Sequence, residues 1–121
     1  MDARDFFEMM ALMRGIMFDS AELDKLEDML IEAKIPYRRE TTQIAYYGKE
    51  LPVRNPNSGL GVGAICSVIS HGYGSEEGLL EIQGLMTDEE IEKSGSYVLG
   101  YLTAENVFER IKNHYEGKDN D

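Results

Sequence analysis

Residues 64–85, AICSVISHGYGSEEGLLEIQGL, contain two apolar runs separated by a polar, glycine-rich segment. The first run, residues 64–70, has the length of a strand, and in the second run leucine and isoleucine alternate with glutamate and glutamine over residues 80–83. Alternation at every second residue is typical of a strand with one buried face. Because the connection between the runs is short, this stretch predicts a β-hairpin.

Extended segments are also predicted on both sides of the hairpin. Residues 37–42 and 43–47 are rich in residues that favour strands. After a turn, residues 51–54 are expected to return as an edge strand, the position in a sheet that tolerates Pro52. Residues 97–102 are predicted to form the last strand.

Helical segments complete the pattern. Apolar residues recur at intervals of three and four within residues 6–17, 23–33 and 107–115, as they do on the buried face of a helix. A further short helix is predicted after residue 87, before the break at residues 94–96.

Capping residues mark where these helices begin. An acceptor residue with a glutamate three positions later, the spacing of a capping box, occurs at Asp19 with Glu22 and again at Thr87 with Glu90. Thr103 is the predicted cap of the last helix. The first two helices are expected to form a pair with almost no linker between them.

These elements predict one α+β domain over residues 1–117, followed by a mobile polar tail at residues 118–121. An antiparallel sheet of four to five strands is expected to pack against the N-terminal helix pair and the C-terminal helix. The length of 121 residues allows one core of this kind and no second.

The composition excludes several classes of function. The chain has 12 Lys and Arg against 23 Asp and Glu, a net charge of −11, which disfavours binding of nucleic acid through a basic face and binding to anionic membranes. The N-terminus lacks the basic start and cleavage site of a signal peptide. With one cysteine and therefore no internal disulfide, a cytoplasmic location is expected.

The residues that usually carry catalysis or metal binding do not form a recognisable motif. Cys66 could pair with His71 or His114, but its apolar neighbours predict a buried structural cysteine with a raised pKa. Two histidines and one cysteine without a ligand spacing predict neither a metal site nor a cofactor. The chain is therefore more consistent with a non-catalytic protein than with an enzyme.

A basic segment interrupts the acidic chain. Residues 1–36 carry 9 acids and 4 bases, residues 37–63 carry 2 acids and 4 bases, and residues 64–121 carry 12 acids and 4 bases. Arginine and tyrosine in the middle segment can bind and stack on an anion, and a glycine-flanked loop adds a histidine and a tyrosine. The candidate ligand-binding residues are Tyr37, Arg38, Arg39, Tyr46, Tyr47, Arg54, His71 and Tyr73. Strand alternation leaves open whether they form one patch or are split across a sheet.

The first helix provides a candidate interface. Methionine adapts to irregular partners, so an apolar face rich in methionine can serve either as core or as the contact with another protein or a second copy of the chain. The candidate interface residues are Phe6, Met9, Met10, Met13 and Met17.

Three stretches of the C-terminal half, residues 65–69, 78–85 and 100–111, together with Asp5-Phe6-Phe7, resemble a group of small acidic proteins encoded by phages and prophages of Gram-positive gut bacteria. The resemblance implies an accessory protein of a mobile element in the host bacterial cytoplasm. It implies no activity or catalytic residue. Residues 37–63 do not contribute to it.

Two functions are therefore expected from the sequence. The first is a non-catalytic phage or prophage accessory protein that binds a host or phage protein, with a homodimer as a further expectation. The alternative is a protein that binds or sequesters a small nucleotide-like anion through the basic segment. An enzyme without a recognisable motif comes third.

Overall fold

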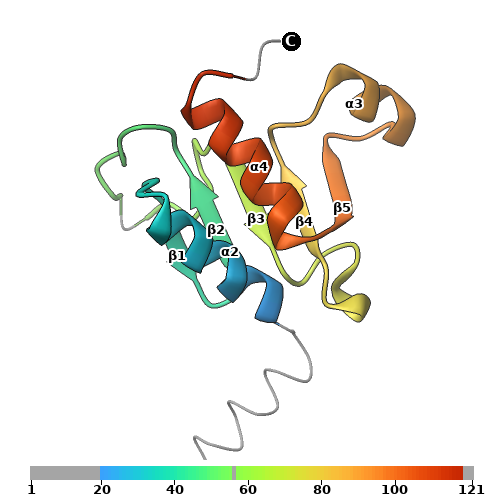
Figure 1. Ribbon diagram of the computed structural model, residues 1–121, viewed down its shortest axis with the longest axis horizontal. Coiled ribbons are helices and arrows are strands. Elements are labelled where there is room, and N and C mark those ends of the chain that lie inside the picture. The colour runs from blue at the N-terminus through green and yellow to red at the C-terminus, as the bar shows by residue number, and fades with distance from the viewer. Residues whose placement is uncertain (1–19, 56, 119–121) are drawn as a thin grey trace, which may run out of the picture.

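A computed structural model of the chain describes residues 20–55 and 57–118 (Figure 1). The helices are α2 (Ala21–Glu32), α3 (Asp88–Ser94) and α4 (Ala104–Tyr115), with a single 3-10 turn, η1 (Ser75–Glu77). The strands are β1 (Arg38–Glu40), β2 (Gln43–Tyr46), β3 (Cys66–Ile69), β4 (Leu80–Gln83) and β5 (Val98–Leu102).

The five strands form one sheet in the order in which they occur in the chain. Every neighbouring pair is antiparallel, and the predicted hairpin pairs β3 with β4 through Val68 opposite Ile82. The α+β class and the antiparallel sheet expected from the sequence are thus confirmed. The first helix of the expected N-terminal pair lies outside the described residues.

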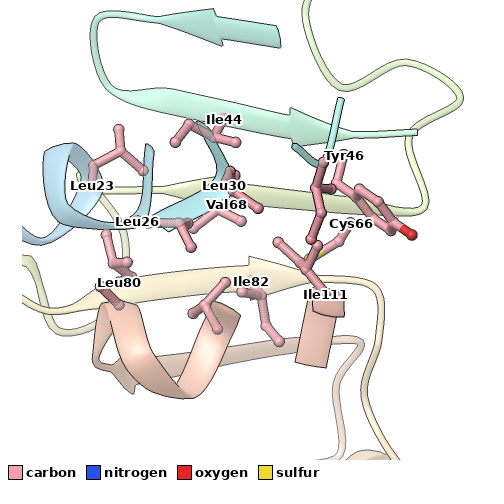
Figure 2. Packing of buried hydrophobic residues seen from close by; sticks show 13 residues of the cluster. Leu23, Leu26, Leu30, Ile44, Tyr46, Cys66, Val68, Leu80, Ile82 and Ile111 are labelled. Carbon is pink, nitrogen blue, oxygen red and sulfur yellow. The ribbon is translucent and has the colours of Figure 1, made fainter. Parts of the chain in front are cut away.

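Helices α2 and α4 lie side by side over one face of the sheet (Figure 1). Alternate residues of the central strands face these helices and are fully buried (Figure 2). Burial of one such aliphatic side chain contributes about 1.5–3 kcal/mol, so this layer supplies most of the stability. The core includes Leu23, Leu26, Leu30, Ile44, Tyr46, Val68, Leu80, Ile82, Val107 and Ile111.

The prediction of an edge strand at residues 51–54 is wrong, because this segment is an irregular loop. Pro52 has no N–H to give to a ladder, and Val53 is 98% exposed, so the segment has no apolar face to bury. The loop contacts the sheet through a side-chain hydrogen bond instead, in which the guanidinium of Arg38 on β1 donates to the carbonyl oxygen of Pro52.

The helix caps follow the predictions in two places. Thr87 and Glu90 form the complete capping box, and Thr103 accepts from the N–H of Asn106 at 3.2 Å. The start of α2 differs: Ser20 is its N-cap without a side-chain cap bond, and Asp19 lies outside the described residues. Glu22 instead accepts the backbone N–H of Ala104 at 2.8 Å, which ties the starts of α2 and α4 together.

None of the helices among residues 20–55 and 57–118 is long and apolar enough to cross a bilayer.

Candidate interaction surface

The basic segment is divided between the two faces of the sheet. Arg39 pairs with Asp24 at 2.6 Å and with Glu27 at 3.0 Å, both on α2. The hydroxyl of Tyr37 donates to Glu27 at 2.9 Å, and burial together with this carboxylate raises the pKa of Tyr37 to about 12. On this face, therefore, the arginine and the tyrosine attach β1 to α2.

Arg38 lies on the opposite face, because neighbouring strand residues point to opposite sides. Its guanidinium is 5.5 Å from the centre of the Tyr47 ring and donates to Pro52. The hydroxyl of Tyr47 accepts the N–H of Gly61 at 3.4 Å. Arg38 and Tyr47 are thus grouped with the loop after β2, apart from Arg39, so the segment does not form one patch.

The other candidate ligand residues lie further apart. Tyr46 is fully buried, its hydroxyl is 2.8 Å from Nδ1 of His114, and the two rings meet edge to face at 5.5 Å. Arg54 is exposed in the loop that follows Pro52, whereas His71 is exposed in the β3–β4 connection. The ring of Tyr46 is therefore part of the core, and Arg54 is near neither His71 nor Tyr73 in the chain.

Cys66 is buried in the core, as expected from its apolar neighbours. Burial raises the pKa of its thiol to about 12, and its sulfur lies 3.8 Å from the carbonyl oxygen of Gly84. A thiol in this environment stays protonated and is a poor nucleophile. Within the described ranges, no group of three or more His, Cys, Asp or Glu side chains is placed to hold a metal ion.

The candidate interface on the first helix, Phe6, Met9, Met10, Met13 and Met17, lies outside the described residues.

The β3–β4 connection is attached to a bulge in β5. The register of β4 and β5 shifts between Leu80 and Ile82, and at this bulge Tyr101 adopts a φ of 61°, an unusual conformation for a residue other than glycine. The N–H of Tyr101 donates to the carbonyl oxygen of Tyr73 at 3.0 Å. The N–H of Tyr73 in turn donates to Glu81 at 3.0 Å, so the loop is held from both sides.

Two glycines permit this close approach. A Cβ atom on Gly100 would lie 2.5 Å from Cβ and from the carbonyl oxygen of Tyr73. A Cβ atom on Gly74 would lie 2.9 Å from Cα of Tyr101, and Gly74 itself has a φ of 100°. Side chains at either position would separate the loop from the bulge.

This arrangement leaves three tyrosines exposed on and beside β5. Tyr73 is 69%, Tyr97 is 71% and Tyr101 is 62% exposed. We refer to these three residues together with β5 as the tyrosine edge. The sequence pattern indicated Tyr73 alone, because the alternation of a strand does not reveal a bulge. Glycines in both the loop and the strand, at positions 74 and 100, are the sequence signal that a close backbone contact leaves.

Helix α3 is fixed beside the tyrosine edge by an ion pair with α4. Arg110 donates to both carboxylate oxygens of Glu90, at 2.7 and 2.5 Å, and to the carbonyl oxygen of Leu85 at 3.1 Å. Arg110, together with the capping bonds of Thr87, lowers the pKa of Glu90 to about 2. Because α3 also contacts β5, this pair sets the position of one end of the edge.

Comparison of the chain with protein-family models, with curated proteins and with solved structures gave no match.

Proposed function

We propose that this chain is a non-catalytic protein-interaction domain, an accessory protein of a phage or prophage that binds a host or phage protein. The observation that carries the proposal is the exposure of Tyr73 and Tyr101 next to each other at a strained backbone position. Tyrosine is enriched in protein interfaces, where a large ring buries much area and loses little conformational freedom.

Backbone strain supports the same proposal. A residue with a side chain in the left-handed region costs of order 1 kcal/mol relative to glycine, and the ring of Tyr101 regains little of that cost through packing because it is mostly exposed. Strained residues of this kind cluster at functional sites. Residues 100–111, which include Tyr101, also belong to the stretches that resemble the phage and prophage proteins.

Affinity capture with the full chain, from the bacterium that encodes it, tests this proposal. We expect a protein, identified by mass spectrometry, that is captured by the native chain and lost with the double variant Tyr73→Ser, Tyr101→Gly. Val53→Ser is the matched control, since it removes an even more exposed apolar side chain far along the chain from the tyrosine edge. Capture that the double variant leaves unchanged contradicts the proposal.

A homodimer formed through the first helix is a separate prediction. Sedimentation of the native chain and of a Met9→Ser, Met13→Ser variant tests it, with a dimer expected for the native chain alone. A monomer at every concentration would contradict the dimer without affecting the tyrosine edge.

A small-anion binding site is the second candidate function, and one observation favours it. The guanidinium of Arg38 contacts a carbonyl oxygen and an aromatic ring and, among the described residues, pairs with no carboxylate. Its positive charge is therefore available to a phosphate, with Arg54 in the adjoining loop. A nucleotide panel should raise the melting temperature of the native chain and not of Arg38→Gln. An equal shift in both proteins, or none, removes this candidate.

A further inference from the structure

The two edge strands of the sheet differ in how they are protected. β1 consists of three charged residues, Arg38, Arg39 and Glu40, and the loop at Pro52 lies against this strand. β5 has five residues and no charged one, and its outer edge pairs with no strand among residues 20–55 and 57–118. Natural proteins usually block such an edge with charges, proline or a bulge. In β5 the bulge affects only the part around Tyr101.

Acidic groups lie at both ends of the exposed edge. Figure 1 shows β5 at the side of the sheet, with α3 near its beginning and the turn that contains η1 near its end. α3 contributes the exposed carboxylates of Asp88, Glu89 and Glu92, and η1 contributes Glu76 and Glu77. Among residues 20–55 and 57–118, Lys93 is the one cation that pairs with any of these five carboxylates, and it lies 3.2 Å from Glu89 on the exposed surface.

We infer that the edge of β5 binds an extended segment of another protein, with an uncharged centre and lysine or arginine at both ends. The centre of that segment pairs with the backbone of β5 on the side of Tyr97, before the bulge interrupts the ladder. Its basic ends lie beside the carboxylates of α3 and of η1, and an arginine can also stack on the exposed ring of Tyr73 or Tyr101. This inference rests on the proposed function and specifies the chemistry of the segment that the proposed partner presents.

A second copy of the chain fits the edge less well. In an antiparallel β5–β5 pair, the α3 end of one copy would lie next to the η1 end of the other, and both ends are acidic. A β5–β1 pair would bring one available cation, Arg38, because Arg39 is already paired with Asp24 and Glu27, and one cation does not match two acidic ends. Each copy also carries a net charge of −11, which opposes their association. Charge complementarity therefore favours a basic segment from a different protein.

Selection from a random library of peptides of about ten residues, displayed and panned on the immobilised full chain, tests the inference. We expect the selected peptides to share an uncharged, β-forming centre and basic ends. Binding of a selected peptide should shift the backbone amide resonances of residues 97–99. It should weaken about tenfold or more as salt rises, and be lost when alternate backbone nitrogens of the peptide are methylated.

The outcomes that overturn the inference are equally specific. Selected peptides without basic ends, binding that survives backbone methylation, or resonance shifts outside the β5 region each contradict it. Two further results would overturn the inference by assigning the edge to another occupant. A dimer that Tyr97→Lys dissociates would assign it to a second copy of the chain. Protection of the β5 amides from hydrogen exchange in the free chain, lost in Met13→Ser, would assign it to the N-terminal segment of the same chain.

The capture experiment separates this inference from the proposed function. If Tyr73→Ser, Tyr101→Gly abolishes capture of a protein but the peptides are not basic-ended strands, the inference fails and the proposed function stands. If capture is independent of these tyrosines, the proposed function fails as well.

Discussion

The backbone N–H of Tyr101 donates to the carbonyl oxygen of Tyr73 at 3.0 Å. This bond joins the β3–β4 connection to the bulge of β5, two segments that are far apart in the sequence. It leaves both rings exposed at the edge of the sheet. The proposed interaction surface depends on this contact.

Gly100→Ala should disrupt the contact. The added Cβ would lie 2.5 Å from Cβ and from the carbonyl oxygen of Tyr73, so the loop and the bulge must move apart. We expect a loss of about 1–3 kcal/mol in the free energy of unfolding. Urea denaturation measures this change. Gly59→Ala is the matched control, because its Cβ would meet nothing within 4 Å, and it should change stability by less than about 0.5 kcal/mol. Equal stability of the two variants would show that the loop does not contact the bulge.

Tyr101→Gly should stabilise the fold by about 1 kcal/mol while it removes an exposed ring. Lys34→Gly provides the control, since Lys34 has a φ of 60° just after α2 and lies away from β5. Both variants should raise the melting temperature, but only Tyr101→Gly should weaken capture of the partner. A Tyr101→Gly protein less stable than the native chain would mean that the ring contributes to packing instead.

Glu90→Gln should change how stability depends on pH. The pKa of Glu90 is lowered from 4.5 to about 2 in the folded chain, chiefly by Arg110. Its ionised form therefore stabilises the fold above about pH 4.5, and that contribution is lost as the pH falls toward 2. Because the side chain is partly exposed, we expect about 1–2 kcal/mol.

The native chain should consequently lose more stability than Glu90→Gln between pH 4.5 and pH 2 in urea denaturation. Glutamine retains the capping box with Thr87, so the difference reports the ion pair with Arg110. Glu89→Gln, which removes an exposed pair with Lys93, should follow the native pH dependence. Parallel curves for the native chain and Glu90→Gln would exclude a stabilising pair.

Figure 2 shows the hydroxyl of Tyr46 at the rim of the core. Tyr46→Phe should destabilise the fold by about 0.5–1.5 kcal/mol, because it removes the hydrogen bond of this hydroxyl with His114. Tyr47→Phe removes a longer bond to Gly61, at 3.4 Å on the other face, and should cost less. Chemical denaturation of the two variants provides the comparison. A larger loss of stability in Tyr47→Phe than in Tyr46→Phe would mean that the bond in the loop after β2 contributes more to stability than the bond to α4.

Cys66 should react with iodoacetamide only when the chain unfolds. Its burial and a thiol pKa of about 12 keep the thiolate fraction negligible near neutral pH. Labelling followed by mass spectrometry should therefore follow the urea unfolding curve. Rapid, complete labelling of the native chain would contradict the placement of Cys66 in the core.

Local features of the sequence predicted much of the fold. The hairpin of β3 and β4 has its alternation and its connection within one stretch, and the capping box at Thr87 is complete within four residues. The prediction of a strand at residues 51–54 fails because Val53 favours a strand in the sequence pattern, whereas in the structure its side chain is exposed and Pro52 cannot donate to a neighbouring strand. Local pattern is sufficient where the contacts themselves are local.

The candidate site depended on contacts between distant segments, and these the sequence did not show. Nothing near Arg39 in the sequence indicates that Asp24 and Glu27 neutralise it, since α2 approaches β1 only in the folded chain. The left-handed conformation of Tyr101 likewise arises from the shift in register between β4 and β5. Alternation allows Tyr37 and Arg39 to lie on one face and Arg38 on the other but left the question open, and it does not indicate Tyr97 or Tyr101.

Hydrogen–deuterium exchange of the full chain, alone and with the captured partner, is the decisive test of binding at the tyrosine edge. Binding at the tyrosine edge predicts slower exchange in residues 97–102 and around Tyr73, with α2 and the loop at residues 51–55 unchanged. Unchanged exchange at β5, with slower exchange confined to other segments, would contradict it.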